Sequence, residues 1–248
     1  MKNNTSDNSP WFASWFDTTY YHLLYQNRDE EEANFFINNL INFLKLSDEY
    51  VLDLACGKGR HAKFLNELGL KVLGVDLSPN SIALAKQYSN DRLSFSVHDM
   101  RQVIRLESFD VVFNLFTSFG YFDDDSDNHK VLQAVHQMLN ENGLFVIDFM
   151  NCQKVINNLI FEEIKSINEI EFSIKRRFDG SHIIKNINFT DNSVDYSFTE
   201  KVRAFKFEDF ESMLVSNRFE ILHVFGDFTL DKFNVTSSDR LIIVARKV

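Results

Sequence analysis

The residues with the clearest chemical potential lie in a glycine-containing stretch, Val51–His61. A short apolar run carries an acid, Asp53, and is followed by small residues, by Gly57 and Gly59, and then by a helix-like pattern. This order predicts a buried parallel strand, a tight turn and the N-terminus of a helix. Glycines let a backbone approach a ligand closely, and a helix N-terminus presents unpaired N–H groups to an anion. The stretch therefore predicts a ligand-binding loop.

Two ligand classes are compatible with this loop. Residues 57–62 fit the dinucleotide fingerprint G-x-G-x-x-G/A, and Asp76 follows at the distance of a ribose-binding acid. Asp53 favours a different ligand, because a carboxylate buried at a strand end is costly unless a cationic or donor-rich group meets it. A nicotinamide-dependent oxidoreductase therefore stays open as the alternative.

The run Val-Leu-Asp-Leu-Ala-Cys-Gly-Lys-Gly-Arg, with Gly74–Ser78 after it, resembles motifs of the class I S-adenosylmethionine-dependent methyltransferases. The usual pattern there is acid-x-Gly-x-Gly-x-Gly, and Ala55 replaces the first glycine with a residue that keeps the turn small. The resemblance covers about residues 50–150 and 205–248. It implies that the cofactor is S-adenosyl-L-methionine.

The resemblance also implies roles for the residues of the cofactor site. Asp53 is expected to hold the methionyl ammonium, and Arg60 the methionyl carboxylate, which would offset an unfavourable cation in the first turn of a helix. Asp76 is expected to bind the ribose hydroxyls, and Asp99 the adenine amino group. The other expected cofactor contacts are Ala55, Gly57, Gly59, Leu77, Met100 and Asn114.

Aromatic residues are the candidates for the methyl-acceptor site. Residues 114–121 follow the fourth predicted strand, where donor and acceptor meet in the family that the chain resembles, and they end in Tyr121. An N-terminal cluster adds Tyr20, Tyr21 and Tyr25, whose rings either pack this segment onto the domain or line the acceptor pocket. Tyr21, Tyr25 and Tyr121 are the predicted acceptor-site residues.

The sequence identifies no unambiguous general base, because His22, His129 and His136 have no recognisable partner. The sulfonium of the cofactor is already an activated leaving group, so an in-line displacement mainly requires positioning. An amine bound in its neutral form needs no base, whereas a hydroxyl or an acidic carbon does. A small-molecule acceptor is expected, with an amine favoured. A non-catalytic cofactor-binding subunit is the remaining alternative.

Composition argues against several other classes. The formal net charge of −10 is unlike the basic footprint of nucleic-acid-binding proteins. The two cysteines imply no disulfide framework, and the acids of residues 123–127 fit a helix N-terminus better than a metal site. No apolar run has the length of a signal peptide core or a membrane span, so a cytoplasmic protein without membrane contact is expected.

Strand and helix patterns alternate from Tyr50 to about residue 150. They predict an α/β, Rossmann-like class I methyltransferase fold with a mostly parallel seven-stranded sheet and helices on both faces. Period-two alternation over residues 161–205, with turn signals at residues 179–180 and 191–193, predicts an inserted three-stranded antiparallel meander. The apolar face of such a meander needs a partner, and a homodimer through the insertion is one expectation.

The expected organisation has four parts. Residues 1–48 form an N-terminal helical cap, and residues 49–160 form the S-adenosylmethionine-binding core. Residues 161–205 are the antiparallel β insertion, and residues 206–248 complete the core.

Overall fold

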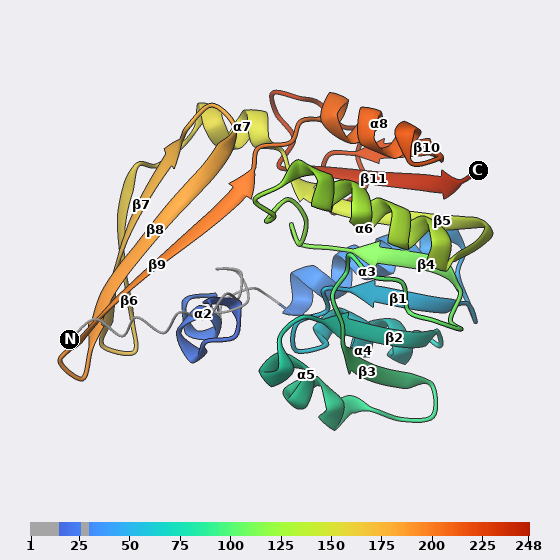
Figure 1. The fold of residues 1–248 in the computed structure, drawn as a ribbon, viewed down its shortest axis with the longest axis horizontal. Coiled ribbons are helices and arrows are strands. Elements are labelled where there is room, and N and C mark those ends of the chain that lie inside the picture. The colour runs from blue at the N-terminus through green and yellow to red at the C-terminus, as the bar shows by residue number, and fades with distance from the viewer. Residues whose placement is uncertain (1–14, 26–29) are drawn as a thin grey trace.

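A computed structural model of the chain describes residues 15–25 and 30–248 (Figure 1). Within these residues the main sheet has seven strands in the order β10-β11-β5-β4-β1-β2-β3. The five strands from β5 to β3 run parallel, and β11 is antiparallel to both of its neighbours. The strands are β1 (Tyr50–Leu54), β2 (Lys71–Asp76), β3 (Leu93–Val97), β4 (Phe109–Asn114), β5 (Leu139–Met150), β10 (Phe219–Phe225) and β11 (Arg240–Lys247). The expected mostly parallel sheet is confirmed.

Helices cover both faces of this sheet. Successive residues of a buried strand point to opposite sides, so both faces carry apolar side chains that must be covered. In β1, Leu52 and Leu54 join the core cluster that contains α6 (Asp125–Met138) and α8 (Phe207–Ser216). Val51 joins the opposite cluster, which contains residues of three further helices. These are α3 (Glu30–Leu44), α4 (Arg60–Glu67) and α5 (Pro79–Ala85), and the short elements η1 (Lys86–Tyr88) and α7 (Cys152–Asn157) complete the helices of this part.

A second sheet follows β5 and has four strands in the described residues, not the three expected from the sequence. They are β6 (Glu162–Ile167), β7 (Ile170–Phe178), β8 (His182–Asp191) and β9 (Val194–Arg203). The first strand was missed because its turn, Asn168–Glu169, has neither a glycine nor a cluster of turn-forming residues; the two residues take φ values of 47° and 67°. Consecutive residues at positive φ are typical of the tight turns that join two strands.

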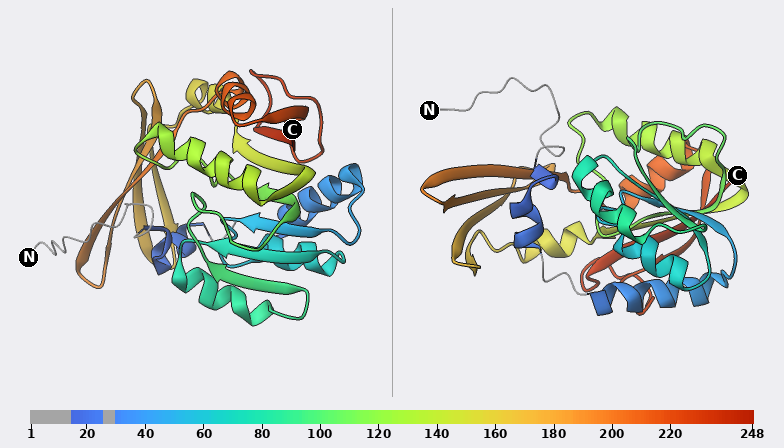
Figure 2. Two further views of the ribbon diagram at one scale, coloured as in Figure 1. Left: turned by 45° about the vertical axis from the view of Figure 1, so that its right-hand side comes forward. Right: turned by 90° about the horizontal axis from the view of Figure 1, so that it is seen from below.

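The apolar face of the second sheet is covered by the helix α2 (Thr19–Leu24) of the same chain. Figures 1 and 2 show α2 lying between the two sheets. Trp15, which is 1% exposed, packs with Leu24 against Phe172 and Phe189 in one cluster. The apolar face of the insertion is therefore covered by a segment of the same chain. A homodimer through this sheet stays a prediction.

The two described helices of the expected N-terminal cap serve different sheets. Helix α2 packs on the insertion, whereas α3 packs on the main sheet through Phe36 and Leu40. Residues 1–14 and 26–29 of that cap lie outside the described residues. Across residues 15–25 and 30–248, no helix combines the length and apolar character that a membrane span requires.

Candidate active site

A cavity of about 570 Å³ opens at the carboxyl ends of the parallel strands. Its walls come from the loops after β1, β2, β3 and β4 and from α2. This is the edge at which open α/β sheets bind ligands. Ten of the residues predicted for the site line this one cavity: Tyr21, Tyr25, Ala55, Gly57, Arg60, Asp76, Leu77, Asp99, Met100 and Tyr121.

Asp76 ties two binding loops together. Its Oδ2 accepts a hydrogen bond from the Gly57 N–H at 2.9 Å, and its Oδ1 accepts one from the Ser78 N–H at 2.8 Å. Burial raises the pKa of this carboxyl, and the two backbone donors offset part of that rise. Each ionised oxygen keeps acceptor capacity for a further hydroxyl. Asp76 can therefore bind a ribose and hold the glycine loop at the same time.

The three small residues of the loop have different roles. Ala55 takes a φ of 65°, a left-handed conformation that costs an L-residue roughly 1–2 kcal/mol. Gly57 takes a φ of 55° and faces open space, since a Cβ placed there would meet no atom within 4 Å. A Cβ on Gly59 would approach the Phe95 ring to 2.6 Å. The glycine at position 59 therefore serves packing of α4 on β3, not ligand approach.

Two buried acceptors lie at the ends of neighbouring strands, behind the lining of the cavity. Asp53 is 1% exposed and its Oδ2 has no hydrogen-bond partner among the described residues. Asn114 donates to the Leu54 carbonyl at 3.0 Å, and its Oδ1 is likewise unpaired within the part that the structure describes. Burial, with a smaller contribution from Asp76, raises the pKa of Asp53 to about 7. Such orphaned acceptors are costly, so they fit an ammonium group or a water that it binds.

Arg60 begins α4 and faces the aromatic part of the cavity. Its guanidinium carbon lies 5.0 Å from the centroid of the Phe116 ring, and its Nη2 is 3.3 Å from the His61 Nε2. His61, 8% exposed, stacks on the same ring at 4.8 Å. The sequence assigned no functional role to His61 or Phe116 individually. Both side chains line the cavity, a placement that no local pattern signals.

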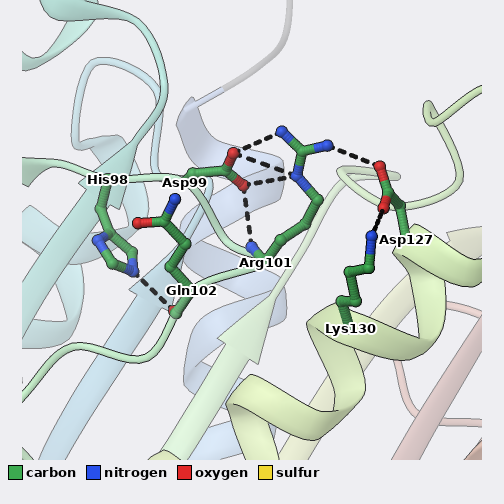
Figure 3. A network of polar contacts seen from close by, with 6 residues as sticks. All are labelled: His98, Asp99, Arg101, Gln102, Asp127 and Lys130. Atoms are coloured by element: carbon green, nitrogen blue, oxygen red, sulfur yellow. Dashed lines mark hydrogen bonds and ion pairs between the residues drawn. The ribbon is translucent and has the colours of Figure 1, made fainter.

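Both carboxylate oxygens of Asp99 accept hydrogen bonds from Arg101, which lies in the same loop (Figure 3). Its Oδ1 accepts the Arg101 N–H at 2.9 Å, and its Oδ2 accepts Nη2 of the same arginine at 2.6 Å. Burial would raise the pKa of Asp99, but the hydrogen bonds and charge of Arg101 outweigh it and the pKa is lowered. Arg101 also pairs with Asp127, which pairs with Lys130, both at 2.6 Å. The adenine contact of Asp99 stays a prediction.

The acidic run before α6 has structural partners. Asp124 is the N-cap and accepts the Ser126 N–H at 2.8 Å. Asp125 pairs with Arg203 at 2.5 Å, which joins this loop to the end of β9. In the part of the chain that the structure describes, no group of three or more His, Cys, Asp or Glu is arranged to hold a metal ion.

Helix α2 and the loop after β4 form the aromatic end of the cavity. Phe16 contacts Tyr121 edge-on at 5.2 Å and Tyr21 at 4.9 Å, and Tyr21 contacts Tyr25 at 4.9 Å. The Tyr25 hydroxyl points away to the insertion, where it donates to Glu200 at 2.7 Å. The three predicted acceptor-site tyrosines therefore meet in one place, and Tyr25 presents its ring.

Tyr20 takes the packing role that the sequence left open for it, whereas His22 lines the cavity. Tyr20 lies against the insertion sheet, where its hydroxyl donates to Asp191 at 2.8 Å. His22 lines the cavity, and burial together with the charge of Lys58 lowers its pKa to about 4. The structure thus supplies a neutral imidazole for which the sequence had no partner. Spacing alone could not reveal it, because Lys58 is 36 residues away in the chain.

Comparisons with known proteins agree with this site. Residues 51–143 match a family model described as a methyltransferase domain. YqeM of Bacillus subtilis (strain 168), a methyltransferase by name, is 29% identical over 207 residues, covering 79% of this chain and 83% of that protein. A glycine/sarcosine N-methyltransferase of Parasynechococcus marenigrum (strain WH8102) is 34% identical over 134 residues, which is 52% of this chain and 46% of that protein.

The fold also has solved counterparts. The crystal structure of an S-adenosylmethionine-dependent methyltransferase from Clostridium acetobutylicum ATCC 824 superposes with a TM-score of 0.78 at 22% identity, covering 92% of this chain and 96% of that chain. The choice left open by the glycine loop is decided by the family match, the named relatives and the fold together. Together these findings support a class I S-adenosylmethionine-dependent methyltransferase whose cofactor is S-adenosyl-L-methionine.

Proposed function

We propose that this enzyme N-methylates a small amine. The observation that carries the proposal is the aromatic end of the cavity, where the rings of Phe16, Tyr21, Tyr25 and Tyr121 share a wall with a neutral His22. Aromatic faces attract a cationic amine, and an uncharged His22 places no competing positive charge beside it. The likeness to a glycine/sarcosine N-methyltransferase supports the same acceptor class.

The bound cofactor would supply an electrophilic methyl group on its sulfonium. Asp76 would hold the ribose, and Arg60 would pair with the methionyl carboxylate. Tyr21 and Tyr121 would orient the amine for in-line displacement and exclude water. The amine would give up its proton to solvent before its lone pair attacks the methyl group. Positioning of this kind can contribute much of the rate enhancement in a displacement reaction.

The proposal is tested by matched acceptors. Formation of S-adenosylhomocysteine from S-adenosyl-L-methionine is measured with glycine, sarcosine and glucosamine, and in parallel with glycolate and glucose, which carry a hydroxyl in place of the amine. We expect turnover with at least one amine and none with its hydroxyl counterpart. Turnover with the hydroxyl compounds alone would contradict the amine assignment.

Tyr21→Ala is expected to reduce turnover while leaving cofactor binding nearly unchanged. Loss of an aromatic wall should cost about 2–3 kcal/mol of acceptor positioning, which is roughly 30- to 160-fold in kcat/KM. Affinity for S-adenosylhomocysteine, measured by calorimetry, should change less than about threefold, because the residues that hold the cofactor come from other loops. Tyr20→Ala is the matched control, since Tyr20 is on the same helix but packs on the insertion. An equal loss of turnover in both variants would show that these rings serve packing only.

A further inference from the structure

The loop after β4 is held in an unfavourable backbone conformation. Phe116 and Thr117 are consecutive non-glycine residues with φ values of 57° and 60°. A β-branched residue at positive φ is a genuine outlier, and such conformations persist only where the surroundings over-determine them. Both residues line the cavity, and the Phe116 ring centroid lies 5.0 Å from the Arg60 guanidinium carbon. Whatever holds this loop therefore shapes part of the cavity wall.

Asp148 on β5 accepts two hydrogen bonds from this loop. Its Oδ2 accepts the Phe116 N–H at 2.7 Å, and its backbone carbonyl accepts the Thr117 N–H at 2.9 Å. The side chain is fully buried, at 0% exposure. The register explains this reach, because Asn114 on β4 pairs with Ile147 on β5 and the loop begins where that pairing ends.

Arg240, the first residue of β11, completes the arrangement. Its Nε donates to Asp148 Oδ1 at 2.7 Å, and its Nη2 donates to the Thr117 hydroxyl at 3.0 Å. Its guanidinium lies 5.6 Å from the centroid of the Phe228 ring, which in turn stacks on Phe116 at 5.4 Å. One ion pair from two strands, with Asp148 buried and Arg240 partly exposed, therefore contacts both strained residues, by the backbone and by a side chain.

We propose that Asp148 and Arg240 are positioning residues for methyl transfer. Neither is among the residues that line the cavity, so they act through Phe116 and Thr117. Without the pair, the two residues would relax toward ordinary backbone conformations and the wall would lose its shape. This inference rests on the proposed methyl transfer to an amine for its kinetic test, but it also has a test that needs no acceptor.

The acceptor-free test is hydrogen exchange at the loop. In Asp148→Asn and in Arg240→Lys, exchange of the amides of residues 115–118 should accelerate at least about tenfold, with peptides over residues 51–60 unchanged. Arg246→Gln is the matched control, because Arg246 lies on the same strand and pairs with Glu220 at 2.5 Å on the surface. It should leave exchange at the loop as in the wild type.

The kinetic test uses the amine that the wild-type enzyme methylates best among glycine, sarcosine and glucosamine. Both variants should lose about 10- to 100-fold in kcat, because a small misplacement of reacting groups has effects of this size. The KM for S-adenosyl-L-methionine should stay within about threefold of the wild-type value. A fall in cofactor affinity equal to the fall in kcat would indicate a general structural role and would overturn the proposal, as would unchanged exchange at the loop.

Arg240→Lys keeps a cation against the buried Asp148. Both the exchange test and the kinetic test can therefore be made on this variant if Asp148→Asn does not fold. The failures of the two proposals are distinguishable. Absence of turnover by the wild type with every amine contradicts the acceptor class and leaves the exchange test standing. Equal kcat in the wild type and the folded variants contradicts the positioning role alone.

Discussion

Asp76→Ala is expected to weaken binding of S-adenosyl-L-methionine by about 3–4 kcal/mol, more than a hundredfold in Kd. Hydrogen bonds to an ionised group contribute about 1.5–3 kcal/mol each, and this carboxylate has two kinds of partner. It is the expected acceptor for the ribose hydroxyls, and it holds the N–H groups of Gly57 and Ser78. The alanine variant would lose the ligand contact and also release the loop that shapes the site.

Calorimetric titration with S-adenosyl-L-methionine measures this effect. Asp91→Ala, which removes an exposed carboxylate elsewhere in the chain, is the control and should bind as the wild type does. The affinity of Asp76→Asn should lie between that of Asp76→Ala and that of the wild type, because one oxygen remains as an acceptor. A folded Asp76→Ala variant with wild-type affinity would remove Asp76 from the cofactor site.

Asp53→Asn is expected to raise the free energy of unfolding of the cofactor-free protein at pH 8 by about 2–4 kcal/mol, given about 1.4 kcal/mol per unit of pKa shift. The pKa of Asp53 rises from an ordinary value of 3.8 to about 7 because the carboxyl is buried. Between these two values the folded state retains a proton that the unfolded state has released. The contribution of Asp53 to stability therefore falls as pH rises from about 4 to 7 and is constant above.

Urea unfolding at pH 5 and pH 8 tests this sign. The stability difference between Asp53→Asn and the wild type should grow toward pH 8, and His22, whose lowered pKa acts in the opposite direction, cancels because both proteins contain it. The affinity of Asp53→Asn for the cofactor should be lower than that of the wild type, since the neutral amide cannot pair with the methionyl ammonium. An asparagine variant that is less stable at pH 8 and binds the cofactor as the wild type does would contradict both parts.

The N-terminal segment requires point substitutions to test its role. Deletion of residues 1–26, for which the sequence predicts a domain that still folds but has lost most methyl transfer, removes two kinds of contact at once. In the structure, α2 covers the apolar face of the insertion sheet, and Trp15 also donates to Glu200 at 2.8 Å. Deletion would expose Phe172 and Phe189 to water, so loss of activity in the deleted protein would combine lost stability with a lost cavity wall.

The main sheet, the cofactor loop and the start of α5 could be predicted from the sequence. Each of these is encoded by contiguous residues: apolar runs for buried strands, glycines for the turn, and Ser78 followed by Pro79 for a helix start. Ser78 does cap that helix, accepting the Ser81 N–H at 2.9 Å. Local signals of this kind need no knowledge of distant residues, and they were sufficient to indicate the enzyme class.

Tertiary structure alone decided which side chains share the cavity and what holds them. His22 meets Lys58, and Asp148 meets Arg240 across 92 residues of chain, so no spacing rule connects them. Gly59 is required by the Phe95 ring on β3 and by its own φ of 81°, and its motif indicates neither. The physical reason is common to all three: the burial, pKa and backbone strain of a residue depend on neighbours that only the folded chain brings together.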